Sequence, residues 1–512
     1  MAARLKNLDR ESPMLFPPDL RDWIPENHIV HFLIGAVDQL PVEDFNINHR
    51  GTGDEQYPPR MMLCLLIYCY ATGRFSSRVI EEATWSDVMV RYICGGDLHP
   101  DHDTICTFRR TNRELFEKAF VKVLLMAQEV AGLKKVGTVS VDGTKIKANA
   151  SKHSAVSYKH AGEQIELLRE EVKQLSAKAE KIDQVPLDDG LSVPDEIARR
   201  EDRLKSLERA RTVIESRYKK EREAKQSEYD AKMAKREQTR KEGKKPRGKD
   251  PQPPAQDPPD KKQYNFTDSE SRIMKSGSGK HFEQAYNAQA AVDTDTYLIV
   301  GQLVTDAPND KQQLNPVLES IPSEVINPEN ILADTGYYSE EAVLKAEANN
   351  GPTVYCAMAK SGHHISVAEL EKQPHPEAPA FDAPMKEQMG YRLKTPKGKE
   401  LYKLRKQTVE PVFGNIKENL GFRRFSMRGK EKVETEWSLI CLTHNLKRIF
   451  KLKGTCAQKQ PAAAVNQRIS IILARISVHL AVYLKKTRNG QATSSKSCSV
   501  FSLNDLLTPT AC

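Results

Sequence analysis

The sequence predicts an α/β domain that follows an all-α N-terminal domain and is interrupted by an inserted helical hairpin. Three observations lead to this fold class. Residues 58–132 carry apolar residues at helical spacing and no strand-like run. Short β-branched or apolar runs recur at 136–142, 285–304 and 329–334. Between them, residues 161–218 repeat apolar side chains at alternating spacings of three and four, the pattern of two packed helices.

Composition places the chain among soluble globular proteins of more than one domain. It has 512 residues, of which 39% are hydrophobic and 29% charged. The apolar run at 469–484 is too short to span a bilayer and carries Arg475, so we expect a buried or partner-facing helix and no membrane partner. The N-terminus lacks the apolar core of a secretory signal. Nine cysteines without a CxxC pair disfavour a zinc site or a disulfide framework, and a reducing, cytoplasmic location is expected.

The net charge of +9 is concentrated in one segment. Residues 199–250 hold 20 lysines and arginines against 11 aspartates and glutamates, so the remaining chain sums to about zero. A polyanionic partner is one interpretation of this segment, and a solvated helix face is the other.

The N-terminal block predicts three helices. The first, 61–73, is entered through Pro58-Pro59 and stopped by Gly73. The second covers 76–96 and the third 104–132. Arg109 and Arg110 in the third are candidate phosphate contacts, although helix arginines usually only solvate a face.

The inserted segment predicts an antiparallel helical hairpin. Its seam residues fall within 165–182 and 197–218, on either side of a turn at 185–196. Beyond Tyr218 the seam fades into charged sequence, and the Pro-rich stretch 243–262 is expected to be a linker.

Strand patterning resumes after the insertion. A hairpin is predicted from strands 285–292 and 297–304 around an Asp-Thr-Asp turn, followed by strands at 329–334 and 352–360. We expect 361–400 to be a loop. Helices are then expected at 408–425 and 434–450, the second of them amphipathic.

Three acids stand at the ends of these elements. Asp142 ends the run 136–141, where Gly143 is expected to break the strand, Asp334 ends another strand, and Glu410 lies near the start of a helix. A strand-end aspartate often only forms a turn. A carboxylate trio with nearby lysines, however, suits Mg²⁺, and two such ions about 3.5–4 Å apart would serve phosphodiester chemistry. Sequence spacing alone does not decide between these alternatives.

Four motifs in order give the chain a family resemblance: DGTKIKANAS (142–151), YNAQAAVD (286–293), ADTGYYS (333–339) and VEPVFGNIK (409–417). With the helical block 58–96, they resemble the bacterial insertion-sequence transposases of the DDE superfamily. The resemblance covers most of residues 10–450 and implies a ribonuclease H-like catalytic domain. It also implies a metal-binding catalytic trio of Asp142, Asp334 and Glu410, with two Mg²⁺ ions as cofactor and Mn²⁺ as a substitute.

The resemblance also suggests DNA contacts around the glutamate. Lys417, seven residues after Glu410, matches the family's lysine. The family's arginine position, four residues before the glutamate, holds Lys406, with Arg405 one place off and Tyr402 likewise one early for the tyrosine. These residues and Lys145 are the candidate contacts, with Lys417 preferred. Pro411 is expected to mark the first turn of its helix.

These inferences predict a DNA transposase that cleaves at element ends and transfers the strand into target DNA, acting as a homodimer on its terminal repeats. The expected domains are 1–132 (DNA-end binding or dimerisation), 133–160 with 263–450 (split catalytic domain), 161–262 (basic coiled-coil arm) and 451–512 (helical tail).

Three alternatives remain. A phosphatase of the haloacid dehalogenase type needs an aspartate where Ser140 stands. A catalytically inactive DNA-binding derivative and a coiled-coil assembly protein are the others, and metal-dependent DNA cleavage separates both from the transposase.

Overall fold

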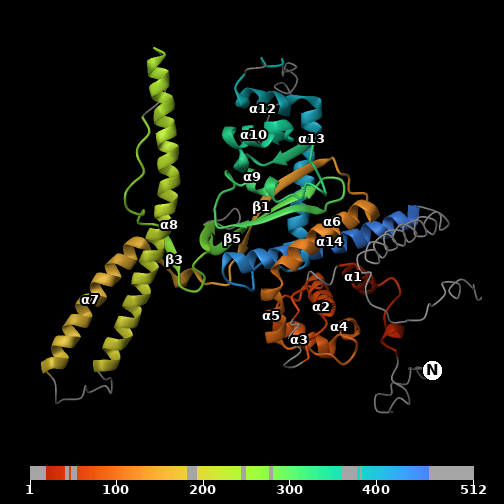
Figure 1. The fold of residues 1–512 in the computed structure, drawn as a ribbon, viewed down its shortest axis with the longest axis horizontal. Coiled ribbons are helices and arrows are strands. Elements are labelled where there is room, and N and C mark those ends of the chain that lie inside the picture. The colour runs from red at the N-terminus through yellow and green to blue at the C-terminus, as the bar shows by residue number, and fades with distance from the viewer. Residues whose placement is uncertain are drawn as a thin grey trace, which may run out of the picture. The chain divides into compact units, whose positions relative to one another are not determined.

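The computed structural model describes residues 19–40, 45–47, 55–181, 193–243, 250–275, 281–358, 377–380 and 383–459 (Figure 1). Residues 1–450 form one compact unit, and the account below concerns that unit. The predicted helix at 469–484 lies outside the described residues. None of the helices within the described residues is both long and apolar enough to cross a membrane.

A mixed sheet carries the second half of the fold, and β1 (Thr138–Lys147) is at its centre. On one side β1 pairs antiparallel with β5 (Phe282–Asp293), from Val139↔Asp293 to Lys147↔Ala285. On the other side it pairs parallel with β7 (Asn330–Ala333), which pairs parallel with β8 (Thr353–Cys356). The outer edge of β5 is shared by two further strands, β4 (Arg272–Lys275) and β6 (Ile299–Thr305). The predicted hairpin is thus confirmed as β5 and β6.

Gly143 does not end the first strand, contrary to the sequence prediction. β1 continues to Lys147 because its pairing with β5 continues, and only the parallel pairing with β7 stops, at Val141↔Ala333. Gly143 is needed instead because neighbouring side chains approach its backbone closely. A Cβ at this position would lie 2.3 Å from the side-chain nitrogen of Gln289 and 2.8 Å from a carboxylate oxygen of Asp310, so a side chain would displace both.

The N-terminal helices are shorter and more numerous than predicted. The first predicted helix is confirmed as α2 (Pro59–Ala71), which is buried over most of its length. The stretch 76–96 forms two helices instead of one, and so does 104–132. The elements are η1 (Leu20–Trp23), α1 (Ile29–Asp38), α3 (Ser77–Ser86), α4 (Val88–Ile93), α5 (His102–Thr111) and α6 (Arg113–Val130).

Two polar residues cause these breaks. Asp87 leaves the helical region and its carboxylate accepts the amides of Met89 and Val90, so it caps the start of α4. Asn112, between α5 and α6, accepts the amide of Asn46 and donates to the carbonyl of Phe108. Hydrogen bonds between these side chains and nearby backbone groups therefore interrupt helices that the apolar pattern predicts to be continuous.

The inserted segment forms two long helices, α7 (Tyr158–Lys181) and α8 (Val193–Lys241). They pack antiparallel, with Ile165, Leu168 and Leu207 in their buried cluster. Most of the predicted turn, 182–192, lies outside the described residues. A two-stranded sheet of β2 (Ala155–Ser157) and β3 (Gln263–Asn265) stands at the base of this pair. The role of the pair as an inserted arm stays a prediction.

The Pro-rich stretch is more ordered than a linker where the structure describes it. Figure 1 shows α8 continuing past the start of α7, with the following chain returning beside it. Asp250 is paired with Arg240 of α8, and the Tyr218 hydroxyl donates to the carbonyl of Ala255. Residues 250–262 therefore pack along α8.

The helices after β6 also depart from prediction. The expected loop at 361–400 contains α12 (Met385–Lys394) and the start of α13 (Pro396–Gly414). α13 ends in a π-helical turn, Asn415–Asn419, rather than continuing to 425. Pro411 lies inside α13, not in its first turn, so its ring removes one helical hydrogen bond just before the π-helical turn. The remaining elements are α9 (Leu314–Glu319), η4 (Thr335–Tyr337), α10 (Glu340–Glu347), η5 (Ala348–Asn350) and α14 (Lys430–Lys459).

α14 joins the sheet to the N-terminal helices. The indole nitrogen of Trp437 donates to the carbonyl of Gln289 in β5, and the Lys447 ammonium donates to the carbonyl of Ala71 in α2. Trp437 is fully buried, and one continuous core runs from α1 to α14. The helix predicted at 434–450 is therefore confirmed, but it is not amphipathic, because 433–446 are buried at nearly every position.

We predict that Trp437→Ala lowers the free energy of unfolding by about 3–5 kcal/mol, because it leaves a cavity between sheet and helices and an unpaired carbonyl. Urea unfolding followed by circular dichroism measures this. The matched control is Trp85→Ala, since Trp85 is 64% exposed. An equal loss in both variants would contradict the central position of Trp437.

Candidate active site

Asp142 and Asp334 lie side by side because of the strand register. Val141 pairs with Ala333, and each acid is the next residue along its strand. The parallel pairing ends at this point, so both carboxylates stand where β1 and β7 separate. In sheets with parallel strands, such ends are the usual place for a site.

Glu410 reaches the same place from α13. The guanidinium of Arg405, one and a half turns earlier in this helix, lies 3.7 Å from Asp142, 3.9 Å from Asp334 and 3.8 Å from Glu410. Acids from three separate elements, 192 and 76 residues apart in sequence, therefore surround one positive charge.

Burial differs among these groups. Only 8% of the Arg405 side chain is exposed, and its Nε has no hydrogen-bond partner. The side chains of Asp334 and Glu410 are about half exposed, whereas that of Asp142 is largely buried. The pKa of Asp142 is raised to about 6, mainly by burial; the Gly143 amide and Arg405 act to lower it, and the charges of Asp334 and Asp310 act to raise it. The site therefore holds negative charge at an energetic cost.

The donor set suits a hard cation. All three side chains offer carboxylate oxygens, and no histidine or cysteine among the described residues joins them to form a metal-binding group. In this arrangement the carboxylates are spread around Arg405 rather than gathered for a metal ion. Three acids that converge on a single cation nonetheless fit a Mg²⁺ site in chemistry.

The arginine in the site is Arg405 and not the residue at the family spacing. Lys406 is exposed, and among the described residues the ion pairs to the three acids come from Arg405. Tyr402, one turn before Arg405, donates its hydroxyl to the carbonyl of Ala333, next to Asp334. Burial raises the pKa of the Tyr402 hydroxyl. The one-residue offsets in sequence thus do not prevent Tyr402 and Arg405 from reaching the acids.

Lys417 and Lys145 contact groups other than the three acids. The ammonium of Lys417, carried on the π-helical turn, donates to the carbonyl of Lys145 in β1 at 2.9 Å. Lys145 lies 3.5 Å from Asp310. Burial lowers the pKa of both ammonium groups. Arg405, rather than Lys417, is ion-paired with all three acids, and the preference for Lys417 as a DNA contact stays a prediction.

Asp310 is a residue that the sequence reading missed. It lies in the loop after β6 and accepts hydrogen bonds from the side chains of Asn287 and Gln289 on β5. The available signal was the pair of amide residues at alternate positions of an otherwise apolar strand, both facing the same side. Their buried polar groups require an acceptor, and Asp310 supplies it.

Arg109 and Arg110 lie away from the acid trio. Arg109 is buried, and its guanidinium donates to the hydroxyl of Tyr70 and the carbonyl of Phe75. Arg110 is exposed at the end of α5. The structure therefore favours direct contact with a phosphate only for Arg110.

Two family models match the chain. A transposase domain (DUF772) matches residues 18–111, from η1 to the end of α5. The transposase DDE domain matches residues 229–446, which include Asp334 and Glu410 but not Asp142. Searches of curated proteins and of solved structures found no significant match.

The two matched regions follow one another in the order that the motifs predict. A DDE domain implies a ribonuclease H-like fold, and the mixed sheet with its helices agrees with that fold. The chain belongs to the insertion-sequence transposases of the DDE superfamily.

Proposed function

We propose that this transposase is catalytically active and moves DNA by cleavage at element ends followed by strand transfer, in the cut-and-paste manner. The observation that supports this proposal is the convergence of Asp142, Asp334 and Glu410 on one cation. A protein that had lost catalysis would have no need to keep three costly acids in one place.

In this proposal the three carboxylates hold Mg²⁺, with Mn²⁺ as a substitute. When bound, the ion supplies charge neutralisation at a phosphodiester and a more acidic water. The chain's own residues position the DNA. Arg405 lies among the acids, and Lys417 donates to β1 three residues beyond Asp142, so both would offer donors to a phosphate that reaches the site.

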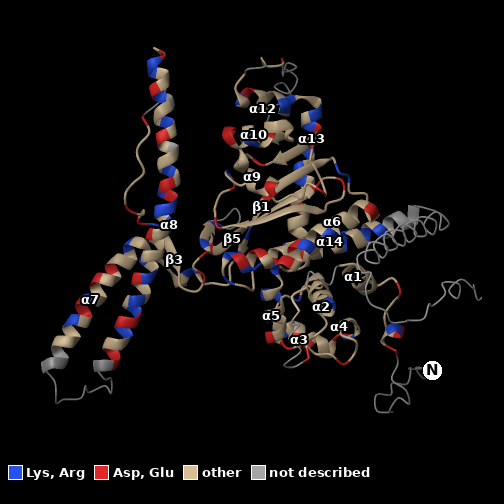
Figure 2. Ribbon diagram, in the orientation of Figure 1, with Lys and Arg blue, Asp and Glu red and all other residues tan. Residues whose placement is uncertain are grey.

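The proposed partners are double-stranded DNA, as element ends and as target, and a second copy of the chain. Both ends of an element must be processed together, so a homodimer on DNA is the simplest assembly. The basic segment of α8, where blue and red stretches of the ribbon alternate in Figure 2, would add nonspecific attraction to DNA.

One observation favours the alternative of an inactive DNA-binding derivative. Arg405 already offsets part of the trio's negative charge, so the acids have a cationic partner without a metal ion. Metal-dependent cleavage of end DNA decides between the two functions.

We expect Asp142→Asn, Asp334→Asn and Glu410→Gln each to abolish Mg²⁺-dependent cleavage of element-end DNA while DNA affinity stays within a few-fold of wild type. Each variant removes a metal ligand but little surface. Cleavage assays on labelled end DNA and gel-shift titrations measure the two quantities. Near-normal cleavage by any one variant would remove that residue from the trio.

We expect Asp142→Asn to raise the stability of the metal-free protein at a pH well above 6. The folded-state pKa of Asp142 is about 6 against 3.8 for the free group, so the folded state loses stability as pH rises from 3.8 through 6. The loss is on the order of 3 kcal/mol and Asn escapes it. Thermal unfolding in a chelator should show the variant's advantage shrinking as pH falls toward 3.8. A constant difference would contradict this pKa.

We expect Arg405→Met to destabilise the metal-free protein by about 3–5 kcal/mol, because three acids then face one another without a cation. Added Mg²⁺ should restore more stability to this variant than to wild type. The matched control is Lys406→Met, whose exposed side chain should change stability by no more than about 0.5 kcal/mol. Thermal unfolding with and without Mg²⁺ tests this, and equal Mg²⁺ shifts in all three proteins would refute it.

A further inference from the structure

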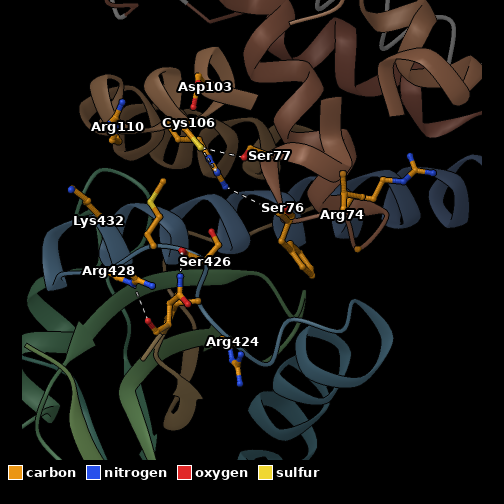
Figure 3. Close-up of a pocket in the computed structure, with 17 residues that line it drawn as sticks. Arg74, Ser76, Ser77, Asp103, Cys106, Arg110, Arg424, Ser426, Arg428 and Lys432 are labelled. Carbon is orange, nitrogen blue, oxygen red and sulfur yellow. Dashed lines mark hydrogen bonds between the residues drawn. The ribbon is translucent and has the colours of Figure 1, made fainter. Parts of the chain in front are cut away.

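A cavity of about 850 Å³ lies between the two regions that the family models match. One wall comes from the start of α3 and from α5 in the helical domain. The other wall comes from the segment 424–428 and the first turn of α14. Figure 3 shows Arg110 and Cys106 on one side and Arg428 and Lys432 on the other.

The lining of this cavity is strongly basic. Its single acid is Asp103, and its cations are Arg74, Arg109, Arg110, Arg424, Arg428 and Lys432. Arg74 is held by an ion pair with Asp87, and in Figure 3 its side chain extends away from the others. By contrast, Arg110, Arg428 and Lys432 are exposed, and no carboxylate of the described residues forms an ion pair with them. Uncompensated cations that surround a hollow predict an anionic ligand.

Two further features favour an anion. Ser76, the residue before α3, makes no side-chain capping bond, so the first-turn amides of this ten-residue helix keep their donors for a ligand. Behind them stands Arg109, which is 4% exposed and whose Nε has no partner. Its other nitrogens contact Phe75 and Cys106, both in the cavity wall. The Tyr70 hydroxyl accepts from Arg109 and donates to the buried Glu436, so the charge of Arg109 is partly balanced, and what it offers the cavity is the unpaired Nε donor.

The cavity is near enough to the acid trio for one duplex to reach both. The backbone of Arg424 forms an isolated β-bridge with Lys147, which is at the end of β1 and five residues beyond Asp142. At about 3.3 Å per strand residue, the five residues from Asp142 to Lys147 span about 17 Å. Phosphates of one DNA strand advance about 3.4 Å each, so the interval corresponds to about five nucleotides.

We propose that this cavity binds backbone phosphates of duplex DNA beside the cleaved position, and so joins the helical domain to the catalytic domain in gripping the substrate. The inference rests on the proposed function for its ligand, which is the DNA of the same reaction. Phosphate contacts carry no sequence information, so the cavity strengthens binding to end DNA and random DNA alike.

The first test is the salt dependence of binding to a linear duplex of random sequence, without metal. The triple variant Arg110→Gln, Arg428→Gln and Lys432→Gln keeps much of each side-chain stem but removes three charges. Its slope of log affinity against log salt should fall by about 3 relative to wild type. The control variant carries Lys122→Gln, Lys386→Gln and Lys394→Gln, all exposed and outside the cavity. Equal slopes in the two variants would overturn the proposal.

The second test needs no substitution. Cys106 lines the cavity and is half-buried, whereas Cys64, Cys69, Cys94, Cys356 and Cys441 are buried. Bound duplex should slow alkylation of Cys106 in the wild-type protein severalfold, as read by mass spectrometry. Unchanged alkylation at saturating DNA would overturn the proposal even if the triple variant failed to fold.

Other outcomes are equally decisive. A triple variant with an unchanged salt slope but a changed oligomeric state in light scattering would show that the cavity takes an acidic surface of a second chain, and the proposal would be wrong. Both tests run without metal or cleavage. They therefore hold if the acid trio proves inactive, and Mg²⁺-induced stabilisation, which the triple variant should retain, reports separately on the trio.

Discussion

The pairing of β1 with β5 is the constraint on which the rest of the fold depends. These strands are neighbours in the sheet, yet α7, α8 and the Pro-rich stretch separate them in the chain. The chain must therefore close a very long loop before the central pair forms, and the closing entropy grows only slowly with its length. Packing between α7 and α8, together with the β2–β3 pair at their base, brings the chain after β1 close to the chain before β5. These contacts help to offset the entropy cost of closing the loop.

That same pairing positions the chemistry. β1 carries Asp142 at the point where β7 diverges, and β5 carries the amides that hold Asp310 beside Gly143. A shift of one residue in the β1–β5 register would turn the side chains of β1 to the opposite face. The apolar residues of both strands oppose such a shift, since Val141 and Ala290 are fully buried. The hydrophobic pattern and the acid geometry therefore depend on one register.

The apolar periodicity of the sequence predicted which helices and strands exist better than it predicted the residues at which they begin and end. The β5–β6 hairpin and α2 follow from alternation and from Pro and Gly boundaries, which are local properties. The breaks at Asp87 and Asn112 depend on side-chain bonds to backbone amides that an apolar pattern does not reveal. Gly143 was misread because glycine serves both as a strand breaker and as a position of close approach, and only the neighbouring Gln289 distinguishes the two. The acid trio came from a family resemblance. Its meeting around Arg405 needed the fold, because residues of β1, the β7 end and α13 have no shared spacing.

Glu436 has a mechanical consequence. This buried carboxylate of α14 accepts the hydroxyl of Tyr70 in α2, and it also accepts the backbone amides of Ser426 and Met427. The segment that contains Ser426 adjoins Phe425, whose amide bonds to Lys147 at the end of β1. The Glu436 side chain thus connects α2, through the segment 425–427, to the strand that carries Asp142. A displacement of α2 relative to β1 would break hydrogen bonds of a buried carboxylate, at about 1–3 kcal/mol for each group left unpaired.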